Sequence, residues 1–270
     1  EPEGSLDPLL FNSEVDPELR NLMRLGPPLP PPDIPPEIDT STLQKDKLLF
    51  FDAKETGCFL AGMDAWLFPE ASAATNFDTL TRLNSMAPDK DQSSQYLPLV
   101  RQLLQNVGEE KLVSGKLDAK YHQTYRNLML AVPWQESCWR QYIKSGNTLV
   151  PLTSTVGSAG LMQVNQNVWR GIYDGKGLLR DIVYNARAGS EIILYYLQEY
   201  AIEKGEHLQA GGMDNLPRAT YAAYNGGPGQ RIRYRSNETK PSLKKIDDLF
   251  WEKYCAVKQG RVMDVVTCYN

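Results

Sequence analysis

The sequence predicts a mainly α protein. Several segments place apolar residues three or four positions apart, which is the spacing of one helix face. No segment shows a convincing alternation of apolar and polar residues, as a half-buried strand would. The chain has 270 residues, of which 41% are hydrophobic and 23% charged, an ordinary composition for a globular protein. This length is enough for one large domain or two smaller ones.

The first region, residues 1–45, is predicted to form a proline-rich extended tail or linker. The stretch 25–37 holds seven of the 18 prolines, and each proline fixes φ and lacks an amide donor. Such a tail suits a spacer from a membrane anchor, a strap packed on the domain or a ligand of a partner protein. These three interpretations stay open.

The second region, residues 46–115, is predicted to form a helical extension packed on the domain that follows. Its clearest helix covers 96–107, where Leu103 and Val107 belong to one apolar face. Gly108 is expected to end this helix, since glycine is common just beyond helix C-termini.

The third region, residues 116–270, is predicted to form the main domain, and its longest helix is expected over 116–139. Leu128 and Val132 precede Glu136 by eight and four residues, so the three side chains share one helix face. An apolar face normally points into a core, and Glu136 would extend it.

The position of Glu136 favours unusual acid chemistry. A carboxylate that continues an apolar stripe is partly desolvated, which raises its pKa and lets it act as a general acid. Pro133 is expected to kink the helix or start a new turn just before it. The alternative is an ordinary solvated glutamate at a frayed helix end.

The rest of the main domain alternates loops and helices. A loop is predicted over 145–160, where Ser, Thr, Gly and Pro are spread through the sequence, and a helix is expected to start within 161–169. A strong helix is predicted over 185–204. Shorter helices are predicted over 217–225 and 246–257.

Composition excludes several classes of function. The net charge of -4 does not favour nucleic-acid binding, for which a basic face is typical. The two histidines lie in no cluster of metal ligands, and the cysteines form no CxxC pair, so neither a metal site nor a cofactor is predicted. No apolar run approaches the ~20 residues of a membrane-spanning helix.

The four cysteines, Cys58, Cys138, Cys255 and Cys268, allow three pairings. The most local is Cys255 with Cys268, which would leave Cys58 to pair with Cys138. Disulfides would indicate an oxidising compartment such as the periplasm. Four buried free thiols are the alternative.

Three short clusters follow one another along the main domain. The first is Glu136-Ser137, the second is Val-Gly-Ser-Ala-Gly-Leu-Met-Gln-Val over 156–164, and the third is Ala-Thr-Tyr-Ala-Ala-Tyr-Asn-Gly-Gly-Pro-Gly over 219–229. In this order, they resemble the lytic transglycosylases with a lysozyme-like catalytic domain, including soluble lytic transglycosylases and their goose-type lysozyme relatives. The resemblance covers roughly residues 120–230.

The resemblance carries over residue by residue. The catalytic acid of the family is the glutamate of a Glu-Ser pair, which matches Glu136 and Ser137. The Gly-Leu-Met-Gln motif matches 160–163, and the Ala-Tyr-Asn-x-Gly motif matches 223–227. The run from Asn185 to Leu197 is a weaker match to a helix of the family.

The resemblance implies a peptidoglycan lytic transglycosylase. Such an enzyme cleaves the β-1,4 bond between N-acetylmuramic acid and N-acetylglucosamine. Glu136 would protonate the leaving oxygen, the 6-hydroxyl of the muramic acid would attack C1, and a 1,6-anhydro end would result. One glutamate would serve as acid and then as base, without a second carboxylate. The expected substrate-binding residues are Ser137, Met162, Gln163, Tyr196, Tyr221, Tyr224 and Asn225.

The implied partner is the glycan strand of peptidoglycan. The expected location is therefore the periplasm or cell envelope. Anchoring to the outer membrane through a removed N-terminal segment, and binding to other envelope proteins, are compatible with the tail.

Three other functions compete with this interpretation. A goose-type lysozyme would use water and a second carboxylate, for which Asp174 and Asp181 are candidates. The run Ser137-Cys138-Trp139 is similar to part of the papain-type cysteine protease signature, but the match ends there. A glycan-binding scaffold without catalysis is the third alternative.

Overall fold

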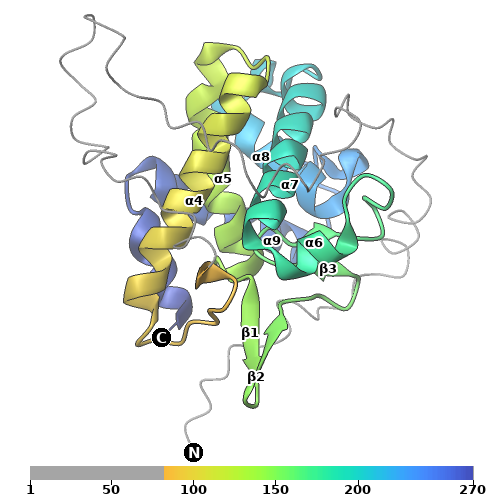
Figure 1. Cartoon of the computed structure of the whole chain (residues 1–270). Coiled ribbons are helices and arrows are strands. Elements are labelled where there is room, and N and C mark those ends of the chain that lie inside the picture. Colours follow the sequence, from red (N-terminus) through yellow and green to blue (C-terminus); the bar gives the residue numbers. More distant parts are fainter. Residues whose placement is uncertain (1–81, 270) are drawn as a thin grey trace, which may run out of the picture.

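The structure is a computed structural model, and it describes residues 82–269. In this part of the chain, helices dominate and two small antiparallel sheets accompany them (Figure 1). The predicted mainly α fold class is confirmed. The tail over 1–45 and most of the extension over 46–115 lie outside the described residues, so the expectations for them stay predictions.

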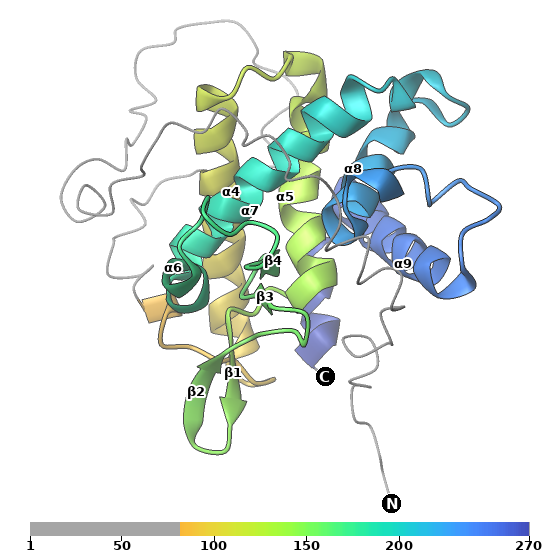
Figure 2. The ribbon, with the colours of Figure 1, turned by 90° about the vertical axis from the view of Figure 1, so that its right-hand side faces the viewer.

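Helix α5 occupies the centre of the fold. It packs against four other helices, and Figure 2 shows it between α4 on one side and α9 on the other. The five helices are α4 (Ser93–Ser114), α5 (His122–Ser137), α7 (Ile182–Tyr195), α8 (Asn215–Gly226) and α9 (Pro241–Lys258). Their buried apolar side chains belong to one core cluster, so the end of α5 lies among packed helices.

Shorter elements connect these helices. A π-helical turn over Tyr196–Ile202 continues α7. The short helix α6 (Gly175–Arg180) precedes α7. Several 3-10 turns also lie within residues 82–269: η2 (Ala119–Tyr121), η4 (Glu206–Leu208), η5 (Gly212–Asp214), η6 (Pro228–Gln230) and η7 (Val262–Tyr269).

The predicted loop over 145–160 is partly wrong, because its start belongs to a β-hairpin. Strand β1 (Tyr142–Ser145) pairs antiparallel with β2 (Thr148–Pro151), with Ser145 opposite Thr148. Gly146, at φ +58°, is the first of the two turn residues, where tight hairpins of type II′ favour glycine. The Gly-Asn pair between two short runs is a hairpin signal that the sequence analysis missed.

The helix expected within 161–169 is also wrong. The segment instead carries β4 (Val164–Asn165), which pairs with β3 (Ser158–Ala159). Gly160 at φ +68° and Gln163 at φ +47° lie in the left-handed region. A right-handed helix cannot continue through such residues, so the chain forms a tight loop between the two strands.

Two helix boundaries differ from the predictions. Helix α4 continues through Gly108 to Ser114 and does not end at the glycine. A Cβ at Gly108 would lie 3.2 Å from Met129 Cγ, so the glycine serves the close approach of α4 to α5. Helix α5 begins only at His122, since Asp118 caps the preceding 3-10 turn by accepting from the Lys120 amide. With 16 residues, α5 is shorter than α4, which has 22.

The later helices agree with the predictions. The helix predicted over 185–204 corresponds to α7 and its π-helical turn, and those over 217–225 and 246–257 correspond to α8 and α9 with longer bounds. Among the described residues, no helix has the length and apolar character needed to cross a membrane.

Candidate active site

Glu136 lies in the last turn of α5, and Pro133 stays inside that helix. The carboxyl is crowded by protein atoms, although the residue keeps some access to solvent. Burial raises its pKa, while nearby Tyr221, Asn225, Arg233 and Lys253 act in the opposite direction. Desolvation has the larger effect, so the carboxyl holds its proton to a higher pH than an exposed glutamate.

Two polar groups of α8 face this carboxyl. Asn225 Nδ2 donates to Glu136 Oε1 at 3.4 Å. The Tyr221 hydroxyl lies within hydrogen-bonding reach of the same carboxyl, and its ring is buried and stacked on Phe250 with 4.0 Å between centroids. The helix spacing of four residues places both groups on one face of α8.

A buried ion pair stands behind Asn225. Arg233 Nη2 donates to Asn225 Oδ1 at 2.8 Å. Arg233 also binds Asp247 of α9 through three hydrogen bonds of 2.8–3.0 Å. The side chains are each only 3% exposed, so the pair is shielded from water.

A second cation approaches from α9. Lys253 Nζ donates to Gln135 Oε1 at 2.6 Å, next to Glu136 in the chain. Burial lowers the pKa of Lys253, and the negative charges of Glu136 and Glu252 oppose this. Arg233 and Lys253 are thus the charged groups that act most strongly on Glu136, and both are cations.

The Gly-Leu-Met-Gln loop lies against the same end of α5. Two buried amides hold its backbone. Gln141 Oε1 accepts from the Leu161 amide, and Asn185 Oδ1 accepts from the Met162 amide, both at 2.8 Å. Asn185 Nδ2 also donates to Ala159 O on the preceding strand. These contacts explain why the loop has a defined shape without helical hydrogen bonds.

Tyr224 of α8 links this loop to the end of α7. The Tyr224 hydroxyl donates to Met162 O, and its ring packs edge-on against Tyr196 with 6.5 Å between centroids. Tyr196 begins the π-helical turn and also contacts Trp169. The structure therefore brings the Met162 loop, α8 and the end of α7 together.

Five of the predicted substrate-binding residues are buried, with less than a tenth of each surface exposed: Ser137, Met162, Gln163, Tyr196 and Tyr221. The Ser137 hydroxyl contacts Leu161 O and Pro133 O, and Gln163 Nε2 donates to Gly160 O at 2.8 Å. These contacts connect the loop to α5. Direct contact of these five residues with substrate stays a prediction.

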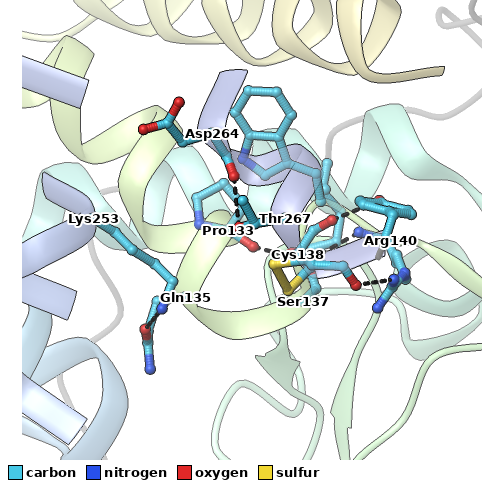
Figure 3. The surroundings of a disulfide bond; sticks show 12 residues. Pro133, Gln135, Ser137, Cys138, Arg140, Lys253, Asp264 and Thr267 are labelled. Atoms are coloured by element: carbon cyan, nitrogen blue, oxygen red, sulfur yellow. Dashed lines mark hydrogen bonds between the residues drawn. A yellow bond between two sulfur atoms is a disulfide. The ribbon is translucent and has the colours of Figure 1, made fainter. Parts of the chain in front are cut away.

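The structure decides among the three possible cysteine pairings, and the most local one, Cys255 with Cys268, does not form. Cys138 is bonded to Cys268 of η7, 130 residues away (Figure 3). Cys255 is free. Cys58 lies outside the described residues. The bond follows Glu136 by two residues and ties the end of α5 to the C-terminal turn. There, Arg140 Nη2 donates to Cys268 O at 2.9 Å.

These positions bear on the competing functions. Cys138 is in a disulfide, which removes the thiol that a cysteine protease would need. Asp174 caps α6 by accepting from Gly177 N, and Asp181 caps α7 by accepting from Val183 N. Both aspartates thus have a structural role at helix starts.

Sequence reasoning missed Arg233, Asp247, Lys253 and Gln141. All four lie outside the three motifs, and no periodic pattern marks them. Only the fold brings them to the motif residues. Within residues 82–269, no group of His, Cys, Asp and Glu side chains is arranged to hold a metal ion.

The mainly α fold, with a crowded glutamate at the end of its central helix, defines a lysozyme-like helical domain. Residues 116–246 match the family model described as Transglycosylase SLT domain, and this part of the chain belongs to that family. The domain is thus of the lytic transglycosylase type that acts on peptidoglycan in the cell envelope. No match was found among curated proteins or among solved structures.

Proposed function

We propose that this protein cleaves the β-1,4 bond between N-acetylmuramic acid and N-acetylglucosamine in peptidoglycan and leaves 1,6-anhydro-muramic ends. Glu136 is the single acid and base of the reaction. The observation that carries this proposal is the environment of Glu136. Burial raises the pKa of its carboxyl, and the charged groups that act most strongly on it are the cations Arg233 and Lys253.

The proposed chemistry balances with one proton carrier. Glu136 donates its proton to the glycosidic oxygen, and the bond from this oxygen to C1 breaks. The 6-hydroxyl oxygen of the same muramic acid forms a bond to C1 as Glu136 takes back the hydroxyl proton. Water is not consumed, so a second carboxylate to activate it is not needed.

Side chains around Glu136 support distinct roles in this proposal. Asn225 and Tyr221 hold the carboxyl. The Tyr224 hydroxyl stabilises the loop by donating to the backbone oxygen of Met162. The partly exposed Tyr224 and Asn225 are candidates for direct sugar contacts, since amides and hydroxyls match N-acetyl and hydroxyl groups. Ser137, Met162, Gln163 and Tyr196 would shape the binding surface from behind.

Product analysis tests the proposal. Purified peptidoglycan is digested with the full chain, and the fragments are analysed by mass spectrometry. We expect anhydro ends and a loss of at least about 100-fold in rate for Glu136→Gln, since a positioned acid contributes about 10²–10⁴-fold. Glu238→Gln, at an exposed position, is the matched control and should cleave normally.

The same digestion distinguishes the competing functions. Reducing ends, with loss of activity in Asp174→Asn or Asp181→Asn, would favour a goose-type lysozyme. Asparagine keeps the helix caps, so these variants remove only the charge. Equal cleavage by the parent and Glu136→Gln would rule out catalysis by Glu136, and glycan binding without cleavage would favour a scaffold.

The cellular setting is part of the proposal. The Cys138–Cys268 disulfide supports an oxidising compartment such as the periplasm. Anchoring to the outer membrane through a removed N-terminal segment, and binding to other envelope proteins, stay predictions.

A further inference from the structure

We propose that Arg233 and Asp247 are positioning residues for the reaction. Their buried ion pair fixes which way the Asn225 amide points, and the amide in turn sets which oxygen of Glu136 carries the acidic proton. The catalytic consequence rests on the proposed function, whereas the orientation of the amide does not.

The ion pair is built as a rigid support. Arg233 follows η6 in the chain, and Asp247 lies on α9, so their hydrogen bonds join two segments. A Cβ at Gly226 would lie 2.6 Å from Arg233 Nη1, so a glycine at the end of α8 leaves space for the guanidinium. Breaking a buried pair by removing one partner leaves an uncompensated charge, which keeps the pair in place.

Arg233 decides the orientation of Asn225 by elimination. A guanidinium has five donors and no acceptor, so only the oxygen of an amide can face it. The 2.8 Å contact therefore involves Asn225 Oδ1, and the Nδ2 group must point the other way, toward Glu136 Oε1 at 3.4 Å. Without Arg233, a 180° flip would turn Oδ1 toward the carboxyl.

This orientation assigns roles to the two oxygens of Glu136. Asn225 Nδ2 is a donor and requires an acceptor, so Oε1 accepts in both protonation states. The proton of the neutral carboxyl then resides on Oε2, which remains to serve the glycosidic oxygen. A flipped amide would present an acceptor, attract the proton to Oε1 and repel the ionised carboxylate.

A purely structural role for the pair makes a different prediction. In that case, Arg233 and Asp247 only join α9 to the segment after η6, and their loss would lower activity regardless of residue 225. A role through Asn225 requires that the effect depend on Asn225. A double-mutant cycle separates the two, because it measures the coupling between neighbouring sites.

The experiment compares the parent, Arg233→Met, Asn225→Ala and the double variant in the peptidoglycan digestion. We expect Arg233→Met to lower kcat by about 10–100-fold with little change in KM, and to have almost no further effect when Asn225 is already alanine. An equal loss in both backgrounds would overturn the proposal. Arg235→Met removes hydrogen bonds to Glu206 instead and should keep its kcat.

A second measurement does not depend on activity. In protein labelled with ¹⁵N-asparagine, the Asn225 side-chain signal, assigned with Asn225→Ala, should follow the titration of Glu136 in the parent. It should stop doing so in Arg233→Met, or in Arg233→Met/Asp247→Leu, which leaves no unpaired buried charge, if the first variant does not fold. Unchanged coupling in the variant overturns the proposal. If the parent cleaves no peptidoglycan, the proposed function fails, and this titration still decides the orientation of the amide.

Discussion

At the scale of single residues, the chemistry of Glu136 is set by competition between burial and polar neighbours. Removing water from around the carboxyl favours its neutral form. Tyr221, Asn225, Arg233 and Lys253 favour the ionised form, but their combined effect is smaller. The same neighbours stabilise the anion that forms after proton transfer, so the group can both give and take back a proton.

The pKa of Glu136 is the first prediction. We expect a ¹³C carboxyl titration by NMR to place it above the ~4.3 of an unperturbed glutamate. Because the neutral acid starts the reaction, activity should fall as the pH rises through this pKa. The Glu136→Gln spectrum identifies the signal. A pKa at or below the unperturbed value would contradict the burial argument.

The stability of Glu136→Gln is the second prediction. The folded protein binds this proton more tightly than the unfolded chain does. The group therefore stabilises the fold fully below the unfolded pKa, and this contribution is lost as the pH rises through the folded pKa. Urea unfolding at pH 8 should show Glu136→Gln more stable than the parent, because the glutamine carries no charge that burial penalises.

Two controls accompany this comparison: the same measurement near pH 4, and a second variant at an exposed glutamate. Near pH 4 the parent carboxyl is neutral when folded, so the difference from Glu136→Gln should shrink. Glu238→Gln, at an exposed site, should match the parent at both pH values. A Glu136→Gln variant that is less stable than the parent at pH 8 would refute the prediction.

At the scale of elements, the loop between β3 and β4 depends on close contact with α7. Gly189 lies within α7, where alanine would normally be the better helix former. A Cβ there would overlap with the Met162 side chain, lying 2.8 Å from its Cε and closer still to Cβ and Cγ. Packing against the loop thus overrides helix propensity at this position.

Gly189→Ala tests this contact and is the third prediction. We expect the free energy of unfolding to fall by about 1–3 kcal/mol, because overpacking displaces a buried side chain. The melting temperature in thermal unfolding should decrease. The value of kcat should decrease too, since the loop contacts α5 beside Glu136. Gly229→Ala is the matched control, because a Cβ there meets no atom within 4 Å. Equal stability of the two variants would count against the packing argument.

At the scale of the whole molecule, the Cys138–Cys268 bond joins the centre of the fold to its C-terminal turn. It closes a loop with a sequence separation of 130 residues. A cross-link that closes a long loop lowers the conformational entropy of the unfolded chain and so destabilises the unfolded state. The chain-entropy model therefore assigns several kcal/mol of stabilisation to the bond. The Tyr269 hydroxyl adds a contact to Cys138 O at 2.7 Å.

Removing this bond is the fourth prediction. The Cys138→Ser/Cys268→Ser variant should lose about 2–5 kcal/mol of unfolding free energy, measured by urea denaturation without reductant. Dithiothreitol should lower the stability of the parent similarly and leave the double variant unchanged. Cys255→Ser should keep the response to reductant, since Cys255 is a free thiol. No response in the parent would contradict the pairing.

Much of the fold and part of the site could be predicted because their signals are local. Apolar spacing identified the helices that became α4, α5 and α7, and it placed Glu136 at the end of a core-facing stripe. The Gly-Asn hairpin signal was present but missed. The helix predicted within 161–169 was wrong because Gln163 adopts a left-handed backbone conformation, which is uncommon for glutamine and cannot be predicted from its residue type.

The helical character and the candidate acid Glu136 followed from residue patterns alone, because each depends on neighbours within a few helical turns. The partner of Cys138 and the Arg233–Asp247 support behind Asn225 emerged only in the folded chain. Proximity in the chain favoured Cys255 for Cys268, yet pairing depends on where helices place their side chains in space. Charged pairs between segments carry no periodic mark, so long-range packing alone could bring them to the site.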